Sequence, residues 1–391
     1  MSHRIAALAL VTAVGCGSES TPGADATADS FDRSALLAHL GSNVLLPIQA
    51  AFDAQAAALP AAITAYCDAL DAGSAAEART AAYAAWGGAM DAWERAEALL
   101  IGPSAMDNKT LRDRIYAWPL LQPCGLDRDT ASRWADPASY SIATKLANVR
   151  SLSAIEYLLF TTSTTHTCVS EPVGWSALAA DLPRARCRLA AAIAVDVAAA
   201  GASLHASWRA DGGDYVGVLA RAGRGSSIAS AQEGVNRVSD GLFYVDRMVK
   251  DMKLGEAAGV TSNVCGTVQE PCMREVELQY ADRGSFAIRS NLAGLRQAFT
   301  GTTDAADGPG FDDFLRAVGS GELADRMTAN LDAAVAKANA MPDSFMGALT
   351  DNYAAVVATH AAINLFTDDL KSQFLTVLAL DIPDDVAADN D

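Results

Sequence analysis

The clearest helical pattern in the sequence runs from Ser74 to Pro103, SAAEARTAAYAAWGGAMDAWERAEALLIGP. Steps of three or four residues separate Tyr83, Trp86, Met90, Trp93, Glu97 and Leu100. Such steps place side chains on one face of an α-helix. Ser74 with Glu77 has the pattern of a capping box, and Gly102-Pro103 is a stop signal. The stretch therefore predicts one helix over 74–101 with an aromatic, apolar face.

The composition of the whole chain favours an acidic, helical protein. Alanine, the residue with the best helix propensity, supplies 82 of the 391 residues, and aromatic residues make up only 7%. Both values argue against a β-sandwich or barrel. The formal net charge of −18 excludes a nucleic-acid binder, because phosphate backbones require basic surfaces.

Helical periodicity recurs along most of the chain and predicts an all-α protein. Two loop-rich regions, 104–137 and 255–283, interrupt it, the first with at most short helices. The further helices that we expect cover 33–70, 139–160, 176–210, 227–252, 285–300, 320–340 and 344–380. We predict two antiparallel helical bundles with long ordered loops, 31–211 and 212–391, the second ending in an acidic, solvated tail.

The N-terminus resembles a bacterial lipoprotein signal. Residues 1–15 combine a weakly basic start with an apolar run, and Cys16 follows a small residue. The resemblance implies that residues 1–15 are removed and that Cys16 is diacylated, so that the protein is tethered to the membrane rather than spanning it. Residues 16–30 then form a flexible tether, and Gly17 favours the outer membrane, facing the periplasm. The alternative is an ordinary signal peptide followed by a chance cysteine.

Six cysteines remain after Cys16. An even number in an exported chain predicts disulfides before metal ligands, and no CxxC pair occurs. Cys265 and Cys272 lie seven residues apart and are the expected local bridge. The pairing of the other four stays open: Cys67, Cys124, Cys168 and Cys187.

Two glutamates interrupt faces that are otherwise apolar. Glu97 lies on the face described above, and a second face on 139–160 consists of Leu146, Val149, Ser153, Glu156 and Phe160. A carboxylate on a core face must be paired, protonated or metal-bound. Together the two acids could form a site for a hard cation between neighbouring helices. They could equally form ion pairs, Glu97 with Arg112 or Arg114, and Glu156 with Arg150 or Lys145.

Several motifs, in this order and spacing, resemble the imelysin-like family. They are Trp93-Glu94-Arg95-Ala96-Glu97, Ile115-Tyr116-Ala117-Trp118-Pro119, Ala154 to Phe160, Lys250 to Gly255, and Glu277 to Gly301. The resemblance covers nearly all of residues 31–381. It implies an exported protein built from two helical bundles. Members are described as insulin-cleaving metallopeptidases, iron-regulated lipoproteins or periplasmic parts of iron-uptake systems.

The metal motif of that family, Gly-x-His-x-x-Glu, is incomplete here. It aligns with residues 151–156, where Ser151 and Ser153 replace the glycine and the histidine and only Glu156 remains. Without the imidazole the best zinc ligand is lost. The chain also has no HExxH motif, and Ser153 has no evident base, so we predict no catalytic residues.

The resemblance also directs attention to the second half of the chain. Glu277, Tyr280 and Asp282 align with an acidic, hydroxyl-bearing stretch of the family and are candidates for an interdomain cleft. The alternative is a loop held only by a disulfide between Cys265 and Cys272.

We therefore predict a non-enzymatic lipoprotein of the cell envelope. It would hold a cation such as iron at Glu97, Glu156 and Glu277, with Ser153 at the family's histidine position. We expect the membrane and metal-uptake proteins as partners, and no nucleic acid. The alternatives are an imelysin-type metallopeptidase and a structural scaffold whose metal motif has degenerated. The scaffold predicts that Glu156 pairs with a basic side chain and leaves no cavity.

Overall fold

The structure is a computed structural model that describes residues 30–383. The predicted signal, Cys16, nearly all of the tether and the acidic end from residue 384 lie outside the described residues. Every regular element in the described range is a helix, so the prediction of an all-α fold is confirmed. The main apolar core extends from Leu36 to Leu380, and a second, small cluster contains Trp175 and Leu182.

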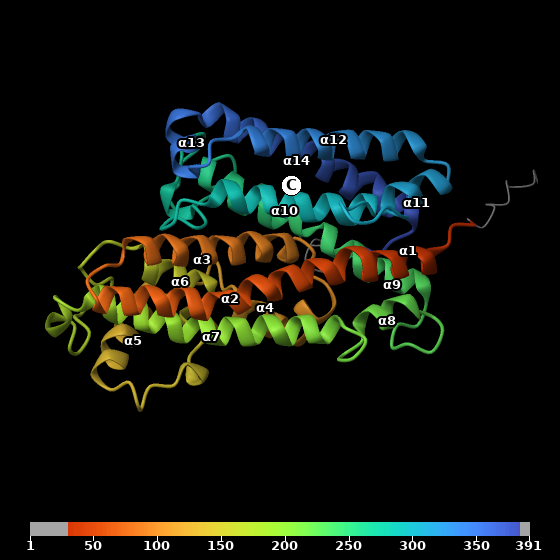
Figure 1. Cartoon of the computed structure of the whole chain (residues 1–391). Helices are drawn as coiled ribbons and strands as arrows, with labels where there is room; N and C mark the ends of the chain where they lie inside the picture. The colour runs from red at the N-terminus through yellow and green to blue at the C-terminus, as the bar shows by residue number, and fades with distance from the viewer. Residues whose placement is uncertain (1–29, 384–391) are drawn as a thin grey trace, which may run out of the picture. The chain divides into compact units, whose positions relative to one another are not determined.

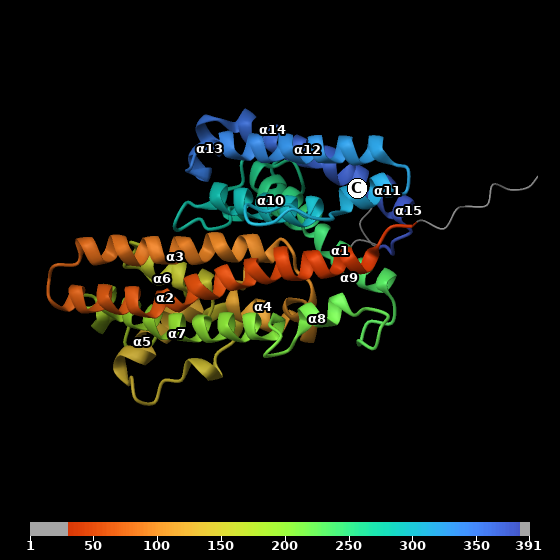
Figure 2. The ribbon, with the colours of Figure 1, turned by 45° about the vertical axis from the view of Figure 1, so that its right-hand side comes forward.

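Three long helices dominate the N-terminal half. They are α2 (Leu46–Asp71), which continues from α1 (Arg33–His39) through the π-helix η1 (Leu40–Leu45), then α3 (Ala76–Glu97) and α7 (Leu182–Trp208). In Figures 1 and 2, α2 lies between α3 and α7, and it packs against both. A disulfide between Cys67 and Cys187 joins α2 to α7.

Two helical stretches, Arg33–Asp71 and Leu182–Trp208, would be long and apolar enough to cross a membrane by length and composition alone. Half of the most apolar window of each is buried inside the protein. Core helices of soluble proteins have the same properties, and these two stretches pack against each other.

Shorter helices follow α3. These are η2 (Gly102–Ser104), α4 (Met106–Ile115), α5 (Pro123–Ala135), η3 (Ile142–Thr144), η4 (Ala147–Val149), α6 (Leu152–Phe160) and η5 (Ser176–Leu178). At 13 residues, α5 is longer than the sequence predicted for this region. A disulfide between Cys124 and Cys168 links its first turn to the segment after α6.

The predicted helix over 139–160 is wrong in its first half. Only Leu152–Phe160 is α-helical, and Leu146 is 74% exposed rather than part of a buried face. The Arg150 guanidinium donates to the carbonyls of Ala143 and Lys145 at 3.0 and 3.3 Å. The Arg150 side chain therefore supplies hydrogen bonds to two carbonyls that backbone amides would bind if this segment were an α-helix.

The predicted capping box at Ser74 is also wrong. Helix α3 begins at Ala76, and its N-cap, Ala75, provides no side-chain hydrogen bond. Gly73 has a φ of 75°, and the Ser74 amide donates to the Ala69 carbonyl at 3.0 Å. Ser74 therefore belongs to the turn that closes α2.

The C-terminal half is more segmented than the sequence predicted. It contains α8 (Tyr215–Ala220), α9 (Ala231–Leu242), the π-helix η6 (Val245–Glu256), η7 (Met273–Glu275), α10 (Gly284–Thr300), α11 (Phe311–Ala317), α12 (Gly321–Ala340), α13 (Phe345–Asp351), α14 (Tyr353–Asp369), the π-helix η8 (Leu370–Phe374) and α15 (Leu375–Leu378). Helix α14 packs against both α12 and η6. The expected helix over 344–380 is interrupted at Asn352, whose ψ of 43° is not helical.

Helices α3 and α10 bring the two halves together. They pack side by side in both views of the ribbon (Figures 1 and 2). A Cβ atom at Gly294 would lie 2.4 Å from the Arg95 carbonyl oxygen, so the two backbones approach as closely as glycine allows. The division into 31–211 and 212–391 stays a prediction.

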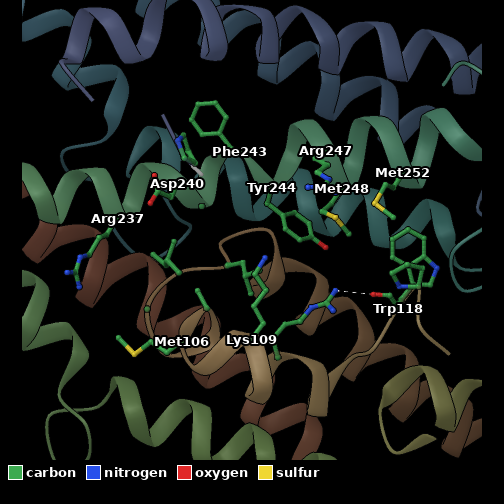
Figure 3. Close-up of a pocket in the computed structure, with 18 of the residues that line it drawn as sticks. Met106, Lys109, Trp118, Arg237, Asp240, Phe243, Tyr244, Arg247, Met248 and Met252 are labelled. Carbon is green, nitrogen blue, oxygen red and sulfur yellow. Dashed lines mark hydrogen bonds between the residues drawn. The ribbon is translucent and has the colours of Figure 1, made fainter. Parts of the chain in front are cut away.

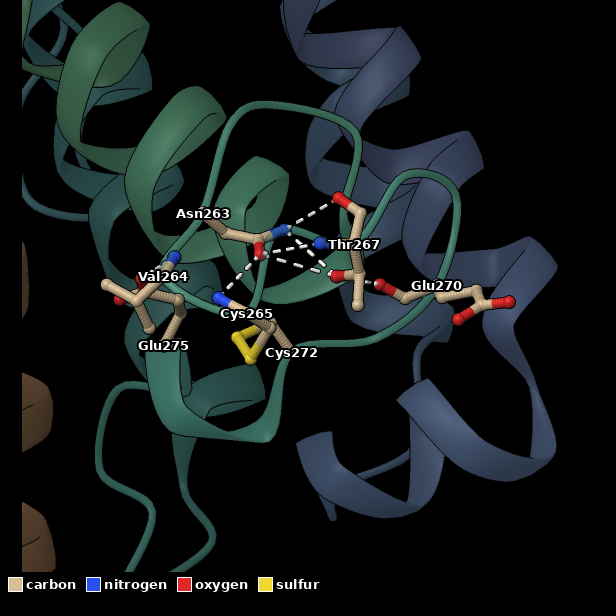
Figure 4. Close-up of a disulfide and its surroundings, with 7 residues drawn as sticks. All are labelled: Asn263, Val264, Cys265, Thr267, Glu270, Cys272 and Glu275. Carbon is tan, nitrogen blue, oxygen red and sulfur yellow. Dashed lines mark hydrogen bonds between the residues drawn. A yellow bond between two sulfur atoms is a disulfide. The ribbon is translucent and has the colours of Figure 1, made fainter.

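The loop before α10 contains the predicted local disulfide. Cys265 and Cys272 are joined, as the sequence indicated (Figure 4). The Asn263 carboxamide binds the Cys265 amide at 3.0 Å and both the amide and the carbonyl of Thr267, at 3.3 and 3.2 Å. This network makes the loop an ordered segment.

Candidate functional site

Four glutamates are buried where α3, α6 and the loop before α10 meet. Glu94 and Glu97 lie on the last turns of α3, Glu156 on α6, and Glu277 just after η7. None of the four is more than 3% exposed. The predicted acids Glu97, Glu156 and Glu277 therefore do point into the protein, and Glu94 joins them. We call these four residues the acidic cluster.

Lys253 of η6 supplies the central positive charge of the acidic cluster. Its Nζ donates to Glu94 Oε2 at 2.5 Å and to Asn291 Oδ1 at 3.0 Å, and it lies 3.1 Å from Glu277 Oε1. Burial lowers the pKa of Lys253, but the carboxylates of Glu277 and Glu94 outweigh burial and hold that pKa above its usual value. Lys253 is therefore charged, and its charge balances the buried carboxylates of Glu94 and Glu277.

Arg112 of α4 is the second buried cation. Its Nε donates to Glu97 Oε1 at 2.6 Å, and its terminal nitrogens bind Asp113 Oδ1 at 3.0 Å and the Trp118 carbonyl at 3.2 Å. The interpretation of Glu97 as an ion-pair partner of Arg112 is confirmed. Arg114, the other candidate, pairs with Asp196 instead, at 2.6 Å.

Glu156 has no basic partner among the described residues. Its Oε1 accepts hydrogen bonds from the Tyr280 and Ala281 amides at 2.9 and 3.1 Å. Burial, aided by the nearby Glu277, raises the pKa of Glu156 to about 8 although these amides lower it. The carboxyl group is therefore mostly protonated at pH 7.

The expected ion pairs of Glu156 are wrong. Arg150 binds Asp196 at 2.6 Å, and Lys145 binds Asp129 at 2.6 Å. Both cations point to other carboxylates because 139–151 contains only two short 3-10 helices and does not continue the α-helix that carries Glu156.

Glu277 connects the loop before α10 to α4. Its Oε1 accepts a hydrogen bond from the Tyr116 hydroxyl at 2.8 Å. Burial raises the pKa of Glu277; Lys253 opposes that rise, and Glu97 adds to it. Burial and the surrounding carboxylates also raise the pKa values of Tyr116 and Tyr244. Both phenols are therefore neutral.

The acidic cluster contains more acid than base, since among residues 30–383 the only basic side chains that its four carboxyl groups contact are Lys253 and Arg112. Three buried oxygens, Glu94 Oε1, Glu97 Oε2 and Glu277 Oε2, have no hydrogen-bond partner within the described part of the chain. Bare buried carboxylates are very costly, so the excess negative charge must be neutralised by protons or by a bound cation. Burial raises the pKa of Glu94 well above its usual range, and Glu277 raises it further, as proton binding requires.

The remaining predicted residues have other contacts. The Tyr280 ring packs edge-on against Tyr157 with centroids 5.1 Å apart. Asp282 caps α13, accepting from the Met346 amide at 2.9 Å and from the Ser344 hydroxyl. Ser153 shares a hydrogen bond of 2.8 Å with Ser151. Tyr280 thus contacts the acidic cluster through its backbone amide, which binds Glu156. Asp282 instead stabilises the first turn of α13.

The Peptidase_M75 family model, described as imelysin, matches residues 46–373. This chain belongs to the imelysin family. No curated protein matches it.

Two solved structures share the fold of this imelysin-family chain. One is an imelysin-like protein from Psychrobacter arcticum, 17% identical, with a TM-score of 0.66 over 91% of this chain and 99% of that one. The other, from Parabacteroides distasonis, is described as an iron-regulated protein A precursor. It is also 17% identical, with a TM-score of 0.68 over 93% of this chain and 96% of that one. At 17% identity, the similarity to these two structures shows a shared fold and nothing further.

The family implies a bound metal, and the atoms in the acidic cluster that could bind one are all oxygens. The three unpartnered carboxylate oxygens and the buried Tyr244 hydroxyl are hard ligands, which suit iron(III), calcium or magnesium better than zinc. They are not arranged as a finished coordination shell, because residues 30–383 include no group of three or more His, Cys, Asp or Glu side chains placed to hold a metal ion. The donor chemistry fits a hard cation, and Lys253 already occupies the centre.

The local sequence pattern does not single out Glu94, Lys253, Tyr116 or Asn291. Asn291 of α10 donates to Glu94 Oε2 at 2.9 Å and to the Glu94 carbonyl at 2.6 Å. All four lie inside the motifs on which the family resemblance rests. Motifs separated by up to about 200 residues in sequence thus lie together in the fold. Their shared membership of the family pattern was the one feature of the sequence that could have indicated these residues.

Proposed function

We propose that this imelysin-family chain is a cell-envelope binding protein without peptidase activity, and that its ligand is a cation such as iron. One observation carries the proposal: the acidic cluster holds four carboxyl groups against two bases and leaves three buried oxygens without partners. A hard cation would replace the protons that otherwise neutralise this excess.

The residues that would hold the cation are Glu94, Glu97 and Glu277, with Glu156 beside them. Their carboxylates supply negative charge and oxygen ligands in a desolvated site, where electrostatic attraction is strong. The fold neighbour described as an iron-regulated protein A precursor supports iron by analogy.

Export and anchoring belong to the same proposal. The apolar run ending at Cys16 supports a cleaved signal with a diacylated cysteine, and the same neighbour is described as a precursor. The protein would then be tethered to the outer membrane and would pass its cation to metal-uptake proteins. A Cys16→Ser variant should move from the membrane fraction to the soluble fraction of the envelope.

The chemistry of the side chains argues against a peptidase. Zinc peptidases use three protein ligands and an open water position, commonly with histidine. Ser151 and Ser153 bind each other at the positions of the family motif. His39 instead contacts the Gly301 carbonyl, and His205 pairs with Asp53, both outside the acidic cluster.

The decisive experiment is elemental analysis of the chain made without residues 1–16, after exposure to iron, zinc or calcium and removal of free metal. We expect about one equivalent of a hard cation and at least a tenfold weaker affinity in Glu277→Gln. Glu322→Gln, the same change at an exposed position of α12, is the matched control. Absence of bound cation from the unaltered chain would overturn the proposal, and chelator-sensitive cleavage of insulin would favour a peptidase.

A purely structural role is the second candidate, and Lys253 favours it. This ammonium already stands between Glu94 and Glu277 and satisfies part of their charge. In this case no cation binds, and the acidic cluster only joins α3, η6 and α10. A cation-free chain that loses stability when Lys253 is replaced would support this role.

A further inference from the structure

A cavity of about 640 Å³ opens between the α4 region and the α9–η6 segment (Figure 3). This volume lies within the range of sites for small organic ligands. Its place in the fold differs from that of the acidic cluster, although Arg112 and Tyr244 belong to the surroundings of both. The function proposed above does not use this cavity.

The walls are mostly aromatic and apolar. Tyr244, which caps η6, and Met248 and Met252 within η6 are spaced four residues apart. Figure 3 shows them on one wall with Trp118 at one end. Met106 lies on the opposite wall, beside Lys109. Methionine and aromatic side chains adapt to flat or irregular apolar ligands.

The charges in the cavity are predominantly positive. Its lining includes four basic residues and a single acid, namely Lys109, Arg112, Arg237, Arg247 and Asp240. Arg237 is engaged with Glu233 at 2.5 Å, and Arg112 with Glu97. Arg247 is exposed and has no hydrogen bond or ion pair to another of the described residues. Its guanidinium is therefore available to a ligand.

The cavity and the acidic cluster have opposite electrostatic preferences. Lys253 Nζ lies 5.7 Å from the Tyr244 ring centroid and 5.9 Å from that of Trp118, so these rings stand between the two sites. The cluster side carries excess carboxyl groups, and the cavity side carries the guanidinium group of Arg247, which is unengaged within residues 30–383. A ligand of the cavity is therefore expected to be an anion.

We propose that this cavity binds a small organic anion with an aromatic or branched apolar body. The Arg247 guanidinium binds the carboxylate, sulfonate or phosphate of the ligand, because its planar fork matches such groups. Trp118, Tyr244 and the methionines of η6 contact the apolar body. Both parts contribute to affinity: an inorganic anion lacks the apolar contacts, and an uncharged body lacks the charged group that Arg247 binds.

Two dyes that differ by one charged group test this proposal. Anilinonaphthalene sulfonate is an aromatic anion, and N-phenylnaphthylamine is nearly the same body without the sulfonate. In fluorescence titrations of the full chain we expect the sulfonate dye to bind with one-to-one stoichiometry, about tenfold more tightly than the uncharged dye. Arg247→Gln should remove this tenfold advantage and leave the affinity for the uncharged dye unchanged.

The control variant is Arg316→Gln, at an exposed arginine of α11 that lies outside the cavity. It should bind both dyes as the unaltered chain does. Equal affinities for the two dyes, an unchanged sulfonate affinity in Arg247→Gln, or multiple weak sites would overturn the proposal. It would also fail if the sulfonate dye bound only after deletion of residues 384–391, because the acidic end of the chain would then be the occupant.

Discussion

Lys253 and Glu94 form an ion pair with 2.5 Å between Nζ and Oε2, and their side chains are 1% and 0% exposed. They come from different halves of the chain, 159 residues apart in sequence. A buried ion pair therefore joins η6 to α3 in the protein interior, where most helices are held together by apolar contacts. Removing one member of such a pair leaves the other charge buried and uncompensated.

Lys253→Met should destabilise the protein by about 3–5 kcal/mol, because Glu94 and Glu277 lose their common counter-charge. Urea unfolding measures the change. Lys337→Met, at an exposed position of α12, should remain within about 0.5 kcal/mol of the unaltered chain. The double variant Lys253→Met/Glu94→Gln should recover part of the loss. No recovery would mean that packing, rather than charge, explains the effect.

Glu156→Gln should change how stability depends on pH. The folded-state pKa of about 8 exceeds the ordinary 4.5, so the contribution of Glu156 is fully present below pH 4.5 and is lost as the pH rises through 8. Between pH 5 and pH 9 the metal-free unaltered chain should lose on the order of 3 kcal/mol relative to the variant. The free energies of unfolding of both chains at several pH values test this.

The control for that experiment is Glu322→Gln, which should follow the unaltered chain at every pH because its carboxyl group is exposed. A stability difference between Glu156→Gln and the unaltered chain that is the same at pH 5 and pH 9 would contradict a raised pKa at Glu156.

The disulfides should differ in their contributions to stability. Cys67–Cys187 spans 120 residues and Cys265–Cys272 only 7. By loop-closure entropy, replacing both cysteines of the long-range pair with alanine should cost about 5 kcal/mol, against about 2 kcal/mol for the local pair. Thermal unfolding of the two double variants tests this order. Equal losses would show that local packing, not chain entropy, determines them.

Gly294→Ala should weaken the contact between α3 and α10. The new methyl group would lie 2.4 Å from the Arg95 carbonyl oxygen, so the helices must separate, at a cost of about 1–3 kcal/mol. Gly321→Ala is the matched control, because its Cβ would meet no atom within 4 Å. It should be neutral or slightly stabilising. Equal stabilities for the two variants would mean that α3 and α10 approach less closely than described.

The periodic positions of Glu97 and Glu156 were sufficient to predict that both carboxyl groups face inward, because helical spacing is a local property. The partner of Glu97 could be narrowed to two arginines, but the partner of Glu156 could not be found. Arg150 and Lys145 lie before the first residue of α6, Leu152, so they do not share a helix with Glu156. The backbone amides of Tyr280 and Ala281, which actually bind Glu156, carry no sequence signal.

By itself, the sequence determined the helical class, the inward direction of the acids and the family, since alanine content, apolar spacing and motif order are all written along the chain. The three-dimensional fold was needed to reveal that Lys253 neutralises part of the acidic cluster, and that a basic cavity opens beside it. Both depend on residues more than 100 positions apart, which are brought together when α3, η6 and α10 bury their common core.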